Sequence, residues 1–194
     1  MRKIIDNGSI YDDGSIYLSN LHLENLPDLS DVEVDGAFDC SINYLTNLVG
    51  SPHTVRGYFA CRKNNLTNLV GSPHTVVYDF DCRETNLTSL KGSPHTVGGD
   101  FDCRENNLTN LEGAPQTVNG SFICSKNPSL TSLEGAPQTV KLGFFCNFQS
   151  KLTSLKGLPK VIGGSLYIDE ILKSKFPAEY IRSLSKIGNS ILYY

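Results

Sequence analysis

Phe101-Asp102-Cys103-Arg104-Glu105-Asn106-Asn107-Leu108-Thr109-Asn110-Leu111-Glu112-Gly113-Ala114-Pro115-Gln116-Thr117-Val118 is one copy of a motif that the chain repeats in both directions. The cysteines give its period, because successive copies lie 21 residues apart and the last lies 22 residues on, at Cys40, Cys61, Cys82, Cys103, Cys124 and Cys146. A fixed period in this range is the signature of a solenoid, in which each turn buries its apolar face against its neighbours. The sequence therefore predicts a mainly β repeat solenoid.

Each turn follows one template, with a Phe-x-Cys pair, an Asn, two Leu residues, a Gly-x-Pro corner and a Val. Side chains two residues apart on a strand point to the same side, so each Phe and Cys is expected in the core. The Asn is expected to satisfy backbone polar groups at the bend that follows. About 12 residues remain for the return, too few for a helix between two corners. We expect one short parallel strand per turn of about 21 residues, with an extended or polyproline-like convex side.

The flanks of the repeat suggest caps. Ile16-Tyr17-Leu18 aligns with the first Phe-x-Cys pair at an offset of 22 residues, and Ile10-Tyr11 is a candidate capping strand. After Leu166-Tyr167-Ile168 the pattern stops, and residues 169–175 and 178–187 are expected to form short helices. The predicted organisation is an N-terminal cap at 1–15, a solenoid at 16–168 and a C-terminal helical cap and tail at 169–194. The apolar tail at 191–194 is expected to pack on the cap or to join a partner, including a second copy.

Composition limits the function classes. The 194 residues have a formal net charge of −3 and 39% hydrophobic residues, so no basic field favours nucleic acid. No stretch approaches a membrane span or a signal-peptide core, and we expect a cytoplasmic protein that does not bind membranes. The cysteines are interpreted as small buried hydrophobes, because they lack both the pairing of zinc ligands and an oxidising context.

The segment Phe59-Ala60-Cys61-Arg62-Lys63-Asn64-Asn65-Leu66-Thr67-Asn68-Leu69 resembles the Leu-x-Leu-x-x-Asn-x-Leu-x-x-Leu segment of leucine-rich repeats. The short period and the prolines look like the bacterial type found in secreted effectors, and the whole template is similar to uncharacterised repeat proteins of bacteriophages and their hosts. Phe and Cys in place of the first two Leu residues depart from the leucine-rich pattern. The resemblance implies a right-handed solenoid with a concave sheet that binds another protein. A phage origin would imply action in the host cytoplasm.

The outward strand positions form an acidic stripe beside an arginine stripe. Two interpretations remain open: a self-paired, solvated sheet face, and a concave surface that grips a protein partner. For the second, the candidate binding residues are Tyr58, Arg62, Asp79, Asp81, Arg83, Asp100, Asp102, Arg104, Phe145 and Phe148.

Catalysis is disfavoured. A glycosidase needs two carboxyl groups in unlike environments, whereas these Asp residues recur by repetition. His53, His74 and His95 recur on an edge where they would not converge on a metal, so no metal or other cofactor is expected. The sequence thus favours a non-catalytic protein-binding scaffold, with a phage inhibitor of a host defence protein as its finer form. The alternative is an assembly component that self-associates through its caps.

Overall fold

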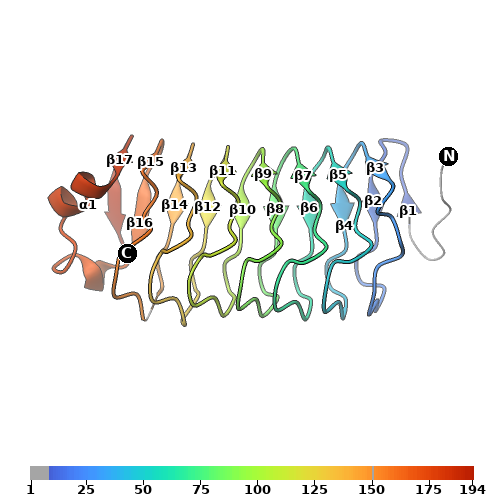
Figure 1. Cartoon of the computed structure of the whole chain (residues 1–194), viewed down its shortest axis with the longest axis horizontal. Helices are drawn as coiled ribbons and strands as arrows, with labels where there is room; N and C mark the ends of the chain where they lie inside the picture. Colours follow the sequence, from blue (N-terminus) through green and yellow to red (C-terminus); the bar gives the residue numbers. More distant parts are fainter. Residues whose placement is uncertain (1–8, 150) are drawn as a thin grey trace.

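The computed structural model is a parallel β-solenoid of about eight turns, and it describes residues 9–149 and 151–194. One strand from each turn enters a ten-stranded sheet A, and a second strand enters an eight-stranded sheet B, so the chain winds between two sheets (Figure 1). Sheet A contains β1 (Ser9–Ile10), β2 (Ile16–Tyr17), β4 (Phe38–Asp39), β6 (Phe59–Ala60), β8 (Phe80–Asp81), β10 (Phe101–Asp102), β12 (Phe122–Ile123), β14 (Phe144–Phe145), β16 (Leu166–Ile168) and β18 (Ile191–Tyr193). Sheet B contains β3 (Glu33–Val34), β5 (Thr54–Val55), β7 (Thr75–Val76), β9 (Thr96–Val97), β11 (Thr117–Val118), β13 (Thr139–Val140), β15 (Val161–Ile162) and β17 (Lys186–Ile187).

The predicted solenoid and its period are confirmed, but each turn has two strands where the sequence predicted one. The Thr-Val pairs of the return pair in parallel and in register, as in Thr75↔Thr96 and Val76↔Val97. Strands on both sides hold successive turns at about 4.8 Å, so neither side is longer than the other. The difference in length that curves a solenoid is absent. We therefore refer to the outer face of sheet A in place of the expected concave face.

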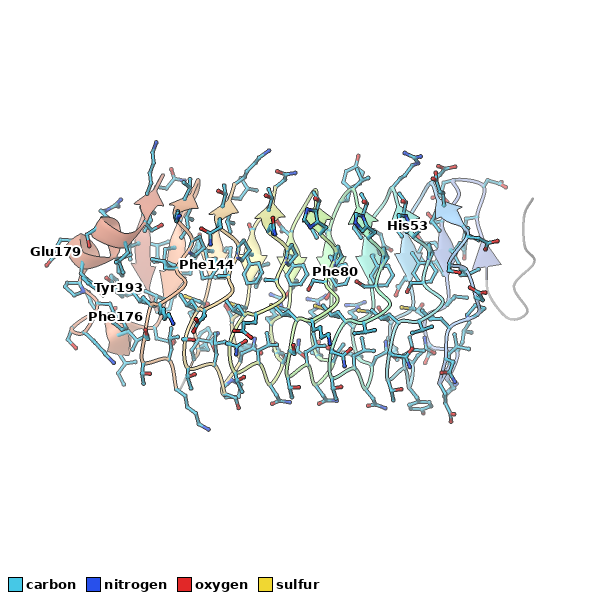
Figure 2. All side chains as sticks on the ribbon, in the orientation of Figure 1. His53, Phe80, Phe144, Phe176, Glu179 and Tyr193 are labelled. Atoms are coloured by element: carbon cyan, nitrogen blue, oxygen red, sulfur yellow. The ribbon has the colours of Figure 1, made fainter. Side chains whose placement is uncertain are left out.

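The core consists of columns of identical side chains, one per turn. Six phenylalanines are fully buried and stack with ring centroids 5.1–5.5 Å apart and interplanar angles of 8–11°. Phe80 and Phe144 lie along this row inside the stack (Figure 2). Each stacked pair adds roughly 0.5–1.5 kcal/mol to the free energy of burial. All six cysteines are free and buried beside the rings, as predicted from their register.

Buried amides tie each turn to the one before it. The Asn106 Oδ1 accepts the backbone N–H groups of Thr85 (3.1 Å) and Leu87 (2.9 Å), and its Nδ2 donates to the carbonyls of Cys82 (3.0 Å) and Cys103 (3.1 Å). Asn43, Asn64 and Asn127 make equivalent bonds. Where Thr85 replaces Asn, its hydroxyl donates to the Cys82 carbonyl at 2.9 Å. The predicted role of this position is confirmed.

The glycine corner is set by contact between turns. Gly71 has a φ of 91°, and a Cβ built on it would lie 2.4 Å from backbone atoms of Leu48 and Val49 in the preceding turn. A side chain here would require both a strained backbone and a wider spacing between turns.

The C-terminal region continues both sheets. After β16 the chain forms a short 3₁₀ helix, η1 (Glu170–Leu172), and one α-helix, α1 (Ala178–Leu184), where a helix was expected to reach residue 187. The helix ends earlier because Lys186 and Ile187 join sheet B as β17, and residues 191–193 then join sheet A as β18. The tail is thus a strand on the last turn. At the other end, β1 pairs antiparallel with β2.

We expect Asn106→Ala to destabilise the fold by about 3 kcal/mol, because it leaves the buried N–H groups of Thr85 and Leu87 without an acceptor and removes one donor each from the Cys82 and Cys103 carbonyls. Urea unfolding measures this change. Asn110→Ala is the matched control and should cost less than about 1 kcal/mol, since within the described residues the Asn110 Oδ1 accepts the exposed N–H of Glu112 at 3.0 Å and no other. Equal losses in the two variants would contradict the role assigned to the buried amides.

Candidate protein-binding face

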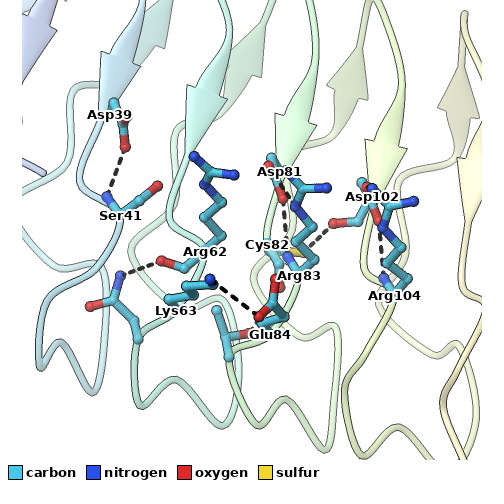
Figure 3. Close-up of polar contacts among 12 residues, drawn as sticks. Asp39, Ser41, Arg62, Lys63, Asp81, Cys82, Arg83, Glu84, Asp102 and Arg104 are labelled. Carbon is cyan, nitrogen blue, oxygen red and sulfur yellow. Dashed lines mark hydrogen bonds and ion pairs between the residues drawn. The ribbon is translucent and has the colours of Figure 1, made fainter.

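The charged part of sheet A's outer face is built from two columns of side chains. Strand register aligns Asp39, Ala60, Asp81 and Asp102 in successive turns. The arginines follow two residues later in three of these turns, so that Arg62, Arg83 and Arg104 lie side by side (Figure 3).

Two of the acids are paired within their own turn. The Arg83 Nε lies 3.2 Å from the Asp81 Oδ2, and the Arg104 Nη2 lies 3.2 Å from the Asp102 Oδ2. The other carboxylate oxygen of each Asp accepts the backbone N–H of the same arginine, also at 3.2 Å. Each Asp thus contacts both the backbone and the side chain of the Arg two residues later, as Figure 3 shows. This pairing within the turn is the geometry of the self-paired interpretation.

Asp79 and Asp100 were predicted to bind a partner, but each accepts a backbone N–H group of the next turn. The Asp79 Oδ1 accepts the backbone N–H of Asp100 at 2.8 Å, and the Asp100 Oδ1 accepts that of Ser121 at 2.6 Å. Both carboxylates therefore connect one turn to the next at the start of a sheet A strand. Their second oxygens are left for other contacts.

Burial changes the acidity of the paired acids. It raises the pKa of Asp102 to about 6, against the lowering effects of the Arg104 backbone N–H and guanidinium, and the neighbouring Asp81 raises it further. Burial also raises the pKa of Asp81, although the Arg83 backbone N–H and guanidinium act in the opposite direction. Ionisation of Asp81 and Asp102 is thus unfavourable, because the two carboxylates lie in adjacent turns and are partly shielded from water.

The array is interrupted at Ala60. The missing carboxylate leaves a shallow hollow of about 260 Å³, lined by Asp39, Tyr58, Phe59, Ala60, Arg62, Asp79, Asp81 and Arg83. Arg62 has no carboxylate in its own turn and makes no ion pair among the described residues. Five of the ten predicted binding residues therefore meet at this hollow: Tyr58, Arg62, Asp79, Asp81 and Arg83.

Tyr58 forms one wall of the hollow and is 39% exposed. Burial raises its pKa to about 12, with the hydroxyl of Tyr17 and the charge of Asp39 acting in the same direction and Arg62 opposing them. The phenol is therefore neutral at physiological pH and can donate a hydrogen bond to a partner.

Phe145 and Phe148 lie elsewhere. Phe145 is four strand spacings from Ala60, roughly 19 Å away, and its ring stacks on Tyr167 at 4.0 Å. Phe148 is at the following corner with a φ of 60° and is 57% exposed. The structure does not bring these two rings to the hollow.

The outer face of sheet A becomes apolar toward the C-terminus. The column that holds Asp81 and Asp102 continues through Ile123, Phe145, Tyr167 and Leu192. The ring of Tyr194 stacks on Tyr167 at 5.9 Å. Leu192 was missed because the sequence repeat was taken to end at Ile168. Tyr167 lies between the buried residues Leu166 and Ile168, and this alternation was the available signal for its outward position.

The three histidines form a ladder on the sheet B side. Their rings stack at 5.4 Å between His53 and His74 and at 6.1 Å between His74 and His95. Parallel rings do not direct their nitrogen lone pairs at a common point. Within residues 9–149 and 151–194 there is no group of three or more His, Cys, Asp or Glu side chains arranged to hold a metal ion.

No protein-family model matches this chain, and neither the curated proteins nor the solved structures yielded a match. The helices of the described residues include none with the length and apolar character needed to cross a bilayer.

The raised pKa of Asp102 predicts a pH dependence of stability. Folding raises this pKa from 3.8 to about 6, so the carboxyl contributes stability that is fully present below about pH 4 and lost as the pH rises through 6. Asp102→Asn keeps an acceptor for the Arg104 N–H and removes the titration. Relative to the wild type, this variant should gain roughly 1–3 kcal/mol between pH 4 and pH 7, measured by urea unfolding.

The control for this prediction is Glu112→Gln, which neutralises an exposed carboxyl and should leave the pH profile of the wild type nearly unchanged. A profile for Asp102→Asn that runs parallel to the wild type from pH 4 to pH 7 would refute the assignment.

Proposed function

We propose that the protein is a non-catalytic binding scaffold that holds a protein partner on the outer face of sheet A, centred on the hollow over Ala60. The observation that supports this proposal is the Arg62 guanidinium, which lacks the carboxylate that Arg83 and Arg104 each have in their own turn. Because Arg83 and Arg104 are already paired with Asp81 and Asp102, a carboxylate of the partner would gain most from binding at Arg62.

The chemistry of the hollow defines the partner group it would accept. A carboxylate over Ala60 occupies the position of the missing Asp and meets the fork of Arg62, with which it forms charge-assisted hydrogen bonds. The Asp39 and Asp81 carboxylates flank that position, and Asp39 has one oxygen bonded to the Ser41 N–H at 2.8 Å. A partner that presents an acid to Arg62 and a hydrogen-bond donor to Asp39 balances both charges.

An aromatic side chain of the hollow supplies apolar contact. Tyr58 is part of its wall and is 39% exposed. Tyrosines are enriched at the energetic centres of protein interfaces because they combine large area with one polar group.

A catalytic role is less consistent with the same geometry. Asp81 and Asp102 occupy equivalent positions, and each is clamped by an arginine of its own turn. General acid and base catalysis needs carboxyl groups whose environments differ. The repetition that builds this face works against such a difference.

The finer form of the proposal rests on the resemblance to phage repeat proteins. It makes the partner a host protein in the cytoplasm, and the scaffold its inhibitor. The shared feature is the sequence template alone.

We expect Arg62→Glu to weaken partner binding at least about tenfold, because the new carboxylate repels the acid of the partner. The substitution breaks no ion pair among the described residues but places a carboxylate beside Asp39 and Asp81, so it should cost on the order of 1 kcal/mol of stability and preserve the fold. The partner is first recovered from a host-cell lysate with wild-type protein, and its affinity for each variant is then measured by calorimetry.

The control replaces His53, His74 and His95 by Gln. The next two turns already have Gln at this position, as Gln116 and Gln138. This variant should bind as the wild type does, with circular dichroism confirming the fold of both proteins. Loss of binding in the histidine variant and retention in Arg62→Glu would place the site on the sheet B side and refute the proposal.

A further inference from the structure

The two ends of the solenoid carry opposite charge. Residues 9–36 contain seven acidic residues and no Lys or Arg. Residues 151–194 contain seven Lys and Arg against three acidic residues, a net charge of +4 from 7 − 3. These segments lie at opposite ends of the stack, with β1 at one end and α1 at the other (Figure 1).

The basic end has a groove of about 480 Å³ beside α1. It is lined by Gln138, Thr153, Ser154, Leu155, Lys156, Gly157, Leu158, Lys160, Phe176, Tyr180 and Leu184. Tyr180 and Leu184 are 45% and 42% exposed, which leaves apolar surface open in the groove.

Two lysines give the groove its charge. Lys156 pairs with Glu134 at 2.9 Å, but their side chains are 70% and 47% exposed, and such surface pairs are worth about 0–1 kcal/mol. Lys160 makes no ion pair among the described residues. Glu134 is therefore readily exchanged for another carboxylate, and Lys160 is available to one.

The acidic end presents a small rigid loop with matching chemistry, residues 11–14 between β1 and β2. The Tyr11 N–H donates to the Ser15 carbonyl at 2.9 Å, and the Asp13 Oδ1 accepts the Ser15 N–H at 2.9 Å. Tyr11 is 52% exposed, and Asp12 and Asp13 are exposed beside it. The loop thus offers one aromatic ring and two carboxylates on a fixed backbone.

We propose that the loop at residues 11–14 of one molecule binds in the α1 groove of a second copy of this chain. Tyr11 packs against Tyr180 and Leu184, while Asp12 and Asp13 meet Lys156 and Lys160. The two surfaces differ and lie at opposite ends, so the contact is heterologous and does not close, and molecules join head to tail into chains. This association goes beyond the proposed scaffold function and leaves the outer face of sheet A free for a partner.

Sedimentation velocity of the full chain tests the proposal. The wild type should form species larger than a monomer as its concentration rises to the sub-millimolar range, and added salt should reverse this growth. A wild type that stays monomeric at low salt in that range would overturn the proposal.

Two variants locate the contact. Asp12→Asn with Asp13→Asn removes the loop charges and keeps an acceptor for the Ser15 N–H, and Lys156→Glu with Lys160→Glu reverses the groove. Each should self-associate at least about tenfold more weakly than the wild type. Lys91→Glu and Glu112→Gln change exposed charges in the middle of the solenoid and should associate as the wild type does. Loss of association in these controls, or its retention in both end variants, would refute the contact.

Mixing the two end variants gives the sharpest result. The intact loop of the groove variant fits the intact groove of the loop variant, so an equimolar mixture should form one-to-one dimers that grow no further. Absence of dimers would refute the pairing of loop with groove. Arg62→Glu should self-associate as the wild type does, which separates a failure of this contact from a failure of the scaffold function.

Discussion

Hydrogen bonding between turns in exact register is the constraint on which this structure depends. A turn of about 21 residues cannot enclose a core alone, and strands of two residues are too short to persist without partners on both sides. Register stacks the six core Phe rings on one another and places the amides of Asn64, Asn106 and Asn127 each near the carbonyls of two cysteines. The buried Asn side chains bond equivalent backbone groups in successive turns, so one arrangement of packing and hydrogen bonding recurs along the stack.

This constraint is visible in the sequence because in-register stacking requires the same side chain at the same position of every turn. The Phe-x-Cys pair predicted sheet A, and the recurring Asn predicted the bonds at the bend. Sheet B was missed because each of its strands offers only one inward residue, such as Val76 or Val97, between a proline corner and a second corner. Two residues show no alternation to read. Their strand geometry comes from pairing across turns, which no single stretch of sequence displays. The same limit hid β17 and β18, whose residues lack the template and join the sheets by position.

The candidate site was predictable in part for the same reason. The two stripes follow from strand alternation, and the gap at Ala60 is visible in the sequence as a turn without its Asp. What the spacing could not reveal is the partner of each carboxylate. Asp79 and Asp81 lie on either side of Phe80 in the sequence. Asp81 accepts the N–H of Arg83 in its own turn, whereas Asp79 accepts the N–H of Asp100 in the next turn. That choice depends on which donor lies within 3 Å or so of a short side chain, a distance set by the packing of turns.

Repetition also determines where function can reside. Where the template is complete, the buried amides are bonded within the fold and Asp81 and Asp102 are paired with arginines, so a partner has little to gain from replacing these contacts. Among the described residues the chemistry departs from this arrangement where the template fails: at Ala60, where an arginine lacks its acid; at Tyr167 and Leu192, where the charged column becomes apolar; and at the two ends, where stacking stops. A repeat protein of this kind acquires specificity through departures from its own consensus. Substitutions that restore the consensus, such as Asp in place of Ala60, should therefore preserve the fold while removing the feature that distinguishes this face from a self-paired sheet.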